Sequence, residues 1–346
     1  MNSGFIIAHA GAGLYSERRE HSAKDACAKA CMHAKLELEA TSNAIAAAVA
    51  AVKVLEDSPV CNAGTGSNLT VNGEVECEAG LMESQTGMAA SVGVCKDYKY
   101  PSELCSRLLK KRKLPKSHGR IPPSMIVSHG VSEFLKEEGF PTNSNEDLKT
   151  DGSRKQYEKW KQFLEDDVKI PTAQDTVGAI CIDPSGEFCV CCSSGGILLK
   201  STGRIGSSAI PGHGFWLDRH MNATGSSTFA TCMTGTGEHI SNTNFALRCS
   251  NLMLHTEDEV QVLESLIREF WEHPSSKYIP NLSLGFIFAK MEAFTGSQSR
   301  RLTYGFANSS PAMAIGHMKT NSKKPHVLIT RNHDKPYTIS VASGRL

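Results

Sequence analysis

The stretch QDTVGAICID, residues 174–183, places a threonine directly before an uninterrupted β-type run, 177–182. The turn sequence DPSG, 183–186, follows, and a second β-type run, 187–192, ends in the glycine pair of SSGG, 193–196. Two apolar runs joined by a short turn that contains proline and glycine are typical of antiparallel pairing. We therefore predict a β-hairpin with Thr176 as the first residue of its first strand.

Thr176 becomes a chain terminus if the Asp175–Thr176 bond is cut. One residue then carries a hydroxyl nucleophile and, in its own α-amine, a base. An α-amine has a pKa near ~8, against ~10.4 for lysine, so a useful fraction is free to accept the hydroxyl proton at neutral pH. The alternative is an ordinary strand threonine, since β-branched residues are common in strands.

The overall composition excludes several classes of protein. The 346 residues include 37 basic and 36 acidic residues, which gives no basic field for direct nucleic-acid binding. The start of the chain lacks a basic segment and a long apolar run, and the alanine-valine run 44–52 is too short to cross a bilayer. We therefore expect no membrane partner and a location in the cytoplasm, the nucleus or both.

Cysteine and histidine spacing does not suggest a metal. The twelve cysteines contain no paired C-x-x-C pattern, so we expect most of them to be reduced core residues and expect no metal and no cofactor. The chain also lacks the G-x-S-x-G, G-x-x-x-x-G-K-[ST] and H-E-x-x-H patterns of other enzyme classes.

The predicted elements do not alternate regularly, which argues against a Rossmann sheet and favours a layered α+β sandwich. We expect helices at 20–38, 44–56 (capped within 41–43), 101–113, 124–138, 154–167, from about 239 to 253, and 257–272. We expect strands, beside the hairpin, at 5–8, 69–71, 74–77, 89–94, 282–289, 302–307, 312–315, 327–330 and 337–341. The polar segment 141–175 is expected to be a mobile linker.

Six blocks occur in a fixed order along the chain. They are HAGAG (9–13), NAG (62–64), DTVGA (175–179), SSGG (193–196), GRIG (203–206) and TGTGEH (234–239). The set resembles the N-terminal-nucleophile hydrolases of the asparaginase type 2 family, and within it the threonine aspartase (taspase) branch. The resemblance implies a four-layer αββα sandwich in a single domain, 1–346. It also implies a precursor that cleaves itself between Asp175 and Thr176 into fragments 1–175 (α) and 176–346 (β), which assemble as (αβ)2.

The resemblance also implies the roles of the site residues. Thr176 is the nucleophile, the Thr234 hydroxyl and the Gly235 amide are oxyanion donors, Ser194 assists the nucleophile and Asn62 lines the same pocket. Arg204 holds a substrate carboxylate, a task that suits its planar guanidinium. The remaining residues assigned to substrate binding are Ser207, Gly237, Gly11 and Gly13.

Ser207 departs from the asparaginase branches, which have an aspartate there that holds the free α-amino group of asparagine. A neutral side chain removes that anchor, and Asp175 makes the self-cleavage site a bond that follows Asp. The resemblance therefore implies a threonine endopeptidase that cuts after Asp in protein substrates such as transcriptional regulators. The alternatives are an L-asparaginase or β-aspartyl peptidase of the same fold, and a non-catalytic scaffold. Two smaller departures, Glu78 and Ser84, concern the fine shape of the substrate pocket.

Overall fold

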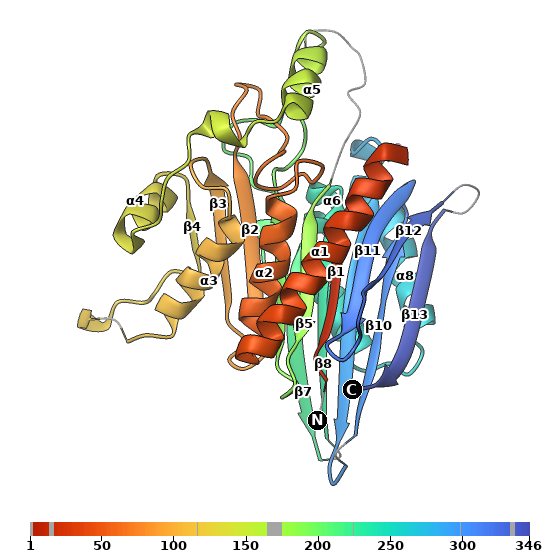
Figure 1. The fold of residues 1–346 in the computed structure, drawn as a ribbon. Coiled ribbons are helices and arrows are strands. Elements are labelled where there is room, and N and C mark those ends of the chain that lie inside the picture. Colours follow the sequence, from red (N-terminus) through yellow and green to blue (C-terminus); the bar gives the residue numbers. More distant parts are fainter. Residues whose placement is uncertain are drawn as a thin grey trace.

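Two stacked β-sheets form the centre of the computed structural model (Figure 1). The structure describes residues 3–13, 17–115, 117–164, 175–223, 225–297, 299–332 and 336–346. Within these ranges the first sheet runs, in spatial order, β12 (His326–Arg331), β11 (Ala312–Lys319), β1 (Phe5–Gly13), β5 (Val177–Ile182), β6 (Phe188–Ser194), β2 (Cys77–Glu83), β3 (Ala89–Cys95) and β4 (Met125–Val127). The second sheet runs β13 (Thr338–Arg345), β10 (Arg300–Asn308), β9 (Leu284–Phe294), β8 (Gly225–Gly235) and β7 (Phe215–Asn222).

Helices cover the outer face of each sheet. In chain order, the α-helices of the described residues are α1 (Glu17–Thr41), α2 (Ala44–Glu56), α3 (Pro101–Arg112), α4 (His129–Glu138), α5 (Asp151–Lys161), α6 (Gly237–Thr243), α7 (Phe245–Met253) and α8 (Glu259–Glu272). Helices α1, α2 and α3 share one apolar core with the first sheet, and α7 and α8 share another with the second sheet. A third core fills the space between the sheets. The predicted four-layer αββα sandwich of the α+β class is confirmed (Figure 1).

The hairpin of β5 and β6 lies inside this sandwich, and its prediction is confirmed except that β5 begins at Val177, one residue after Thr176. Val177 pairs with Ser193, and the register continues without a break to the pair of Ile182 and Phe188. Alternate residues of β5 enter different cores, since Val177 faces the helices and Ile180 faces the second sheet. Both faces are buried, which explains why the sequence is an uninterrupted apolar run rather than an alternating one.

Several helix predictions need correction. The helix at 44–56 is confirmed, and the Asn43 side chain caps it by accepting hydrogen bonds from the amides of Ile45 and Ala46. The predicted helix at 124–138 is wrong in its first turn, because 125–127 form β4 beside β3 and Ser128 has a φ of 52°. The helix expected to continue to 253 is divided by Asn244, whose φ of 48° ends α6.

The strand predictions missed β4, β7, β8 and all but the first residue of β2. The hairpin expected at 69–77 is reduced to a single bridge between Leu69 and Val75. The strand that follows this bridge is β2, and it was missed because glutamate and glycine are not typical of strands. Strand β7 mixes charged and apolar residues, since one of its faces packs on the first sheet while the other is partly exposed.

The segment before Thr176 is described only in part. Helix α5 starts three residues earlier than predicted, and the Thr150 side chain caps it. Asn145 attaches the region to the body of the protein through hydrogen bonds to the backbone of Val75 and Lys96. Residues 165–174 lie outside the described residues, so the mobility of the linker stays a prediction.

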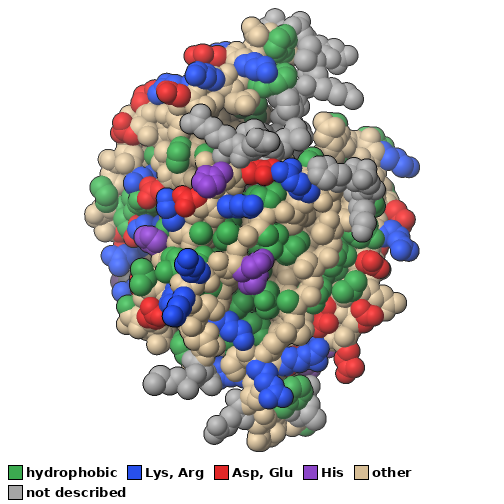
Figure 2. Space-filling view, turned by 45° about the vertical axis from the view of Figure 1, so that its right-hand side comes forward, with side chains coloured by type: hydrophobic (Ala, Val, Ile, Leu, Met, Phe, Trp, Pro, Cys, Tyr) green, Lys and Arg blue, Asp and Glu red, His purple; other side chains and the backbone are tan. Residues whose placement is uncertain are grey.

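All twelve cysteines are buried and none forms a disulfide, as predicted. No helix in the described ranges is long and apolar enough to cross a membrane. Acidic and basic side chains are interspersed on the face shown in Figure 2, in keeping with a formal net charge of +1.

Candidate active site

Thr176 stands where three strands from both sheets meet. It precedes β5, and its hydroxyl is hydrogen-bonded to the hydroxyl of Ser194, the last residue of β6, at 3.2 Å. Its backbone N–H donates to Oγ1 of Thr234, near the end of β8, at 3.0 Å. The structure thus brings together three of the predicted catalytic residues, although Ser194 and Thr234 belong to different sheets.

The carbonyl of Asp175, which belongs to the bond predicted to be cut, has two donors. Asn62 Nδ2 donates to this oxygen at 2.9 Å, and Ser194 Oγ lies at 3.5 Å from it. Asn62 is itself held in place, because its Nδ2 also donates to the carbonyl of Gly196 at 2.7 Å and its Oδ1 accepts the N–H of Asn68 at 2.8 Å. The two donors polarise the carbonyl and stand where negative charge develops on attack by a hydroxyl.

Thr234 and Gly235 occupy different positions relative to this bond. Thr234 Oγ1 contacts the nitrogen side of the peptide, not its carbonyl. Gly235 lines the adjacent cavity with a φ of 126°, and a side chain there would lie 2.3 Å from the carbonyl oxygen of Ser283. In the uncut chain the carbonyl contacts therefore come from Asn62 and Ser194, while the oxyanion role of Thr234 and Gly235 toward a substrate stays a prediction.

The Asp175 side chain is buried in a pocket of its own. Its carboxylate forms an ion pair with Arg19. Burial raises the pKa of the Asp175 carboxyl, and the charge of Arg19 acts in the opposite direction. Gly11 and Gly13 form the opposite wall, where added Cβ atoms would lie 2.7 Å and 2.9 Å from atoms of Asp175. The two glycines predicted to bind substrate therefore contact the uncut chain itself, and Arg19 is a contact that the sequence reasoning missed.

A small polar cavity lies next to Thr176. Its volume is about 10 Å³, which is room for about one water molecule. It is lined by Glu78, Asp175, Thr176, Ser194, Gly196, Ile197, Arg204, Gly206, Ser207, Gly235 and Gly237. The uncut chain therefore contains the predicted site in a closed form, with no space for an amino acid.

Arg204 contributes a positive charge to this cavity. Its Nε and Nη2 both bind Oε1 of Glu238, at 2.8 and 2.7 Å, and Glu238 is half exposed. An added Cβ on Gly237, the first residue of α6, would lie 3.0 Å from Nη2, so the absence of a side chain lets the guanidinium approach. The arrangement suits a carboxylate ligand that takes the place of Glu238.

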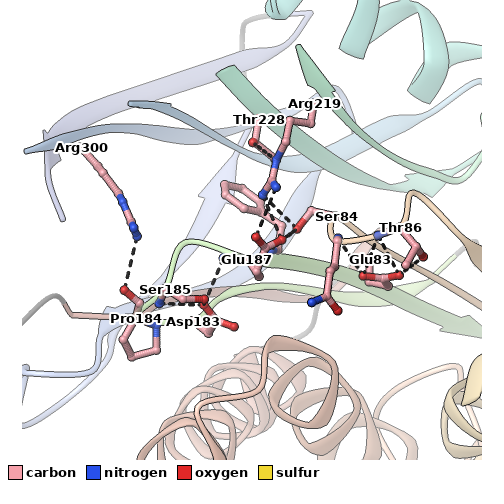
Figure 3. A network of polar contacts seen from close by, with 12 residues as sticks. Glu83, Ser84, Thr86, Asp183, Pro184, Ser185, Glu187, Arg219, Thr228 and Arg300 are labelled. Carbon is pink, nitrogen blue, oxygen red and sulfur yellow. Dashed lines mark hydrogen bonds and ion pairs between the residues drawn. The ribbon is translucent and has the colours of Figure 1, made fainter. Parts of the chain in front are cut away.

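Ser84 does not belong to this site. It follows β2 at the far end of the sheet, where its hydroxyl donates to Glu187 at 2.5 Å and accepts the N–H of Phe188 at 2.8 Å (Figure 3). Arg219 binds the same Glu187 carboxylate from the second sheet. Since β6 runs from Phe188 to Ser194, this network and the cavity lie at opposite ends of one strand, and the expectation that Ser84 shapes the substrate pocket is not met.

The chemistry available at Thr176 is that of hydroxyls, amides and charges. No group of three or more His, Cys, Asp or Glu side chains that suits a metal occurs among the described residues. His9 is a neighbour of β5 and contacts the thiol of Cys232, but burial lowers its pKa to about 3, so its ring is neutral. The α-amine that a cut would create is therefore the base best placed to serve the Thr176 hydroxyl.

Comparison with known proteins is decisive for the family. A family model described as asparaginase matches residues 2–275. The chain belongs to the asparaginase family. Within it, the chain is 31% identical to an isoaspartyl peptidase/L-asparaginase from Bos taurus over 280 residues, which cover 80% of this chain and 84% of that protein.

Two further asparaginase relatives extend the similarity. A plant-type L-asparaginase from Pyrococcus furiosus is 29% identical over 335 residues, covering 92% of this chain and 98% of the relative. The isoaspartyl peptidase/L-asparaginase of Homo sapiens is 30% identical over 249 residues, covering 71% and 75%.

These relatives contradict the prediction of a taspase-type endopeptidase. Their names match the alternative interpretation, an L-asparaginase or β-aspartyl peptidase. The prediction depended on the neutral Ser207, one side chain of the cavity. It treated Glu78 only as a smaller departure, although this carboxylate lines the same cavity from β2, the strand that pairs with β6.

Proposed function

We propose that this member of the asparaginase family cleaves itself before Thr176 and then hydrolyses L-asparagine and β-aspartyl dipeptides. The observation that carries the first step is the geometry of the Asp175–Thr176 bond. Asn62 Nδ2 and Ser194 Oγ converge on its carbonyl oxygen, and the Thr176 hydroxyl is bonded to Ser194. The names of the relatives support the choice of substrates.

Self-cleavage begins with attack of Thr176 Oγ1 on the carbonyl carbon of Asp175. Negative charge that forms on the carbonyl oxygen is stabilised by Asn62 and Ser194. The C–N bond then breaks, and the hydroxyl proton ends on the departing Thr176 nitrogen, which is bonded to Thr234. Water hydrolyses the resulting ester, releasing the Asp175 carboxylate and restoring the Thr176 hydroxyl beside a free α-amine.

The substrate reaction repeats this attack on a side-chain carbonyl. The free α-amine of Thr176 takes the hydroxyl proton, and Oγ1 attacks the β-carbonyl of asparagine or of a β-aspartyl dipeptide. Ammonia or the second amino acid leaves with that proton, and water hydrolyses the β-aspartyl ester to aspartate. Arg204 holds the α-carboxylate of the substrate, which replaces Glu238 as its partner.

The test compares three substrates after the cut is complete. Wild-type protein is expected to release ammonia from L-asparagine and leucine from β-aspartyl-leucine, and to leave a peptide with an internal α-linked Asp–Gly bond intact. Thr176→Ala is expected to turn over none of them. Cutting of the α-linked peptide without release of ammonia from L-asparagine would overturn the proposal.

Assembly and location remain predictions. Native mass spectrometry of the cut protein tests the (αβ)2 assembly. The mass of a single αβ pair would contradict it. Microscopy of the tagged chain tests the expected location in cytoplasm or nucleus.

A further inference from the structure

Glu78 is a buried carboxylate that lines the cavity, and the proposed reaction gives it no role. It lies on β2 opposite Ser194 and is 2% exposed. One of its oxygens accepts the N–H of Gly206 at 2.5 Å, and the other accepts the hydroxyl of Ser208 at 2.6 Å. A carboxylate offers about four acceptor positions, so these two bonds leave it capacity for a ligand.

The Glu78 carboxylate and the Arg204 guanidinium flank the same residue. An added Cβ on Gly206 would lie 2.5 Å from Glu78 Oε1 and 2.7 Å from Arg204 Nη1. Both side chains line the cavity, as does the neutral Ser207. One negative and one positive group therefore face the same small space beside Thr176.

An α-amino acid head group has the matching pattern, because its ammonium and carboxylate are attached to one carbon. We propose that Glu78 accepts a hydrogen bond from the α-ammonium of the substrate while Arg204 binds its α-carboxylate. This inference rests on the proposed function. The site then selects free asparagine and β-aspartyl dipeptides with an unmodified α-amine. Amides that lack this ammonium or carry an acyl group on it are expected to bind more weakly, since they lose the charge-assisted hydrogen bond to the Glu78 carboxylate.

Two neighbouring charges, Glu238 and Lys200, already interact with this pair. The ion-paired partner of Arg204 in the described residues is Glu238. Lys200 lies behind the cavity, where its Nζ donates to the backbone carbonyl of Glu76 at 2.5 Å. Burial lowers the pKa of Lys200, and the charge of Glu78 opposes that shift, so the two groups attract each other without a direct contact.

The experiment uses L-asparagine and succinamate, which is asparagine without the α-amine. Wild-type protein is expected to favour L-asparagine in kcat/KM. Glu78→Gln keeps the size of the side chain and is expected to lower kcat/KM for L-asparagine about 10- to 100-fold while leaving that for succinamate nearly unchanged. Glu78→Asp, which keeps the charge, is expected to retain part of the preference.

Glu76→Gln is the matched control. Glu76 is a buried carboxylate of the same segment that binds Lys96 and the N–H of Gly203 and does not line the cavity. This variant is expected to keep the wild-type preference. Intact mass after self-cleavage shows that each variant has folded.

The outcomes separate the two proposals. Equal losses on both substrates in Glu78→Gln would assign Glu78 a purely structural role and overturn the inference. Equal wild-type activity on L-asparagine, succinamate and N-acetyl-asparagine would overturn it without any variant, even if Glu78→Gln does not fold. Wild-type protein that cuts itself and hydrolyses neither amide would instead refute the proposed function.

Discussion

Replacing Asn62 by alanine tests the geometry of self-cleavage directly. Asn62 Nδ2 lies 2.9 Å from the carbonyl oxygen of Asp175, and the variant removes this donor while leaving Thr176 and Ser194 in place. Loss of one oxyanion donor typically costs ~2.7–4 kcal/mol of barrier, or ~10²–10³ in rate. Because Ser194 Oγ remains 3.5 Å from the same oxygen, we expect the lower end, a cut slower by about 100-fold.

Asn68→Ala is the matched control for this experiment. Asn62 and Asn68 each donate a side-chain hydrogen bond to the carbonyl of Gly196, at 2.7 and 2.9 Å, but only Asn62 also binds the carbonyl of Asp175. Both variants therefore loosen the same loop, but only Asn62→Ala removes a donor to the carbonyl of Asp175. Asn68→Ala is expected to cut at nearly the wild-type rate.

The assay follows intact mass over time at neutral pH, starting from freshly purified protein. The cut is measured as the fraction of chain divided between Asp175 and Thr176, and thermal unfolding shows that the variants are folded. The reasoning is refuted if Asn62→Ala cuts as fast as wild type, or if Asn68→Ala slows the cut to the same degree.

Three further predictions follow from the same contacts. Thr176→Ala is expected to stay a single chain by intact mass and Thr176→Ser to be cut; two fragments from the alanine variant would exclude Thr176 as the nucleophile. Arg19→Gln removes the partner of the buried Asp175 carboxylate, so we expect a slower cut that improves as the pH falls and Asp175 is protonated; a rate and a pH profile equal to wild type would contradict this. Burial raises the pKa of Glu56 from 4.5 to about 8. Between these two pH values the folded chain keeps a proton that the unfolded chain has lost. This group therefore makes the free energy of unfolding fall by about 1.4 kcal/mol per pH unit up to about pH 8. Glu56→Gln is expected to remove this fall in urea unfolding at pH 5.5 and 8.5, and equal slopes in the two proteins would contradict it.

The hairpin was predictable from local sequence, whereas the nucleophile role of Thr176 depended on the six blocks taken together and stays a prediction. The apolar run of β5, the turn after Asp183 and the capping residue Asn43 depend on neighbours a few positions away, so their signals are complete in the sequence. The break at Ser128 was not predictable in this way, because a φ of 52° at a serine is set by the pairing of β4 with β3.

The missing parts of the candidate site are contacts between distant positions. Glu78 and Gly206 are 128 residues apart, and Arg19 and Asp175 are 156 apart. Interpreting Ser207 and Asp175 without the position of Glu78 therefore led to a substrate class that the relatives contradict. Gly11 and Gly13 were assigned to substrate binding, and the sequence did not indicate that the group beside them in the uncut chain is Asp175.

The order of strands in the first sheet has a consequence for the products of the proposed cut. Strand β1 of the leading fragment is inserted between β11 and β5 of the trailing one, and β6 of the trailing fragment pairs with β2 of the leading one. The two polypeptides are therefore interleaved in the first sheet. Two of the three hydrophobic cores contain residues of both fragments, whereas the core between α7, α8 and the second sheet comes from the trailing fragment alone. The two fragments are expected to run as two bands on a denaturing gel but to purify and unfold as one complex. An affinity tag on either fragment is expected to co-purify the other.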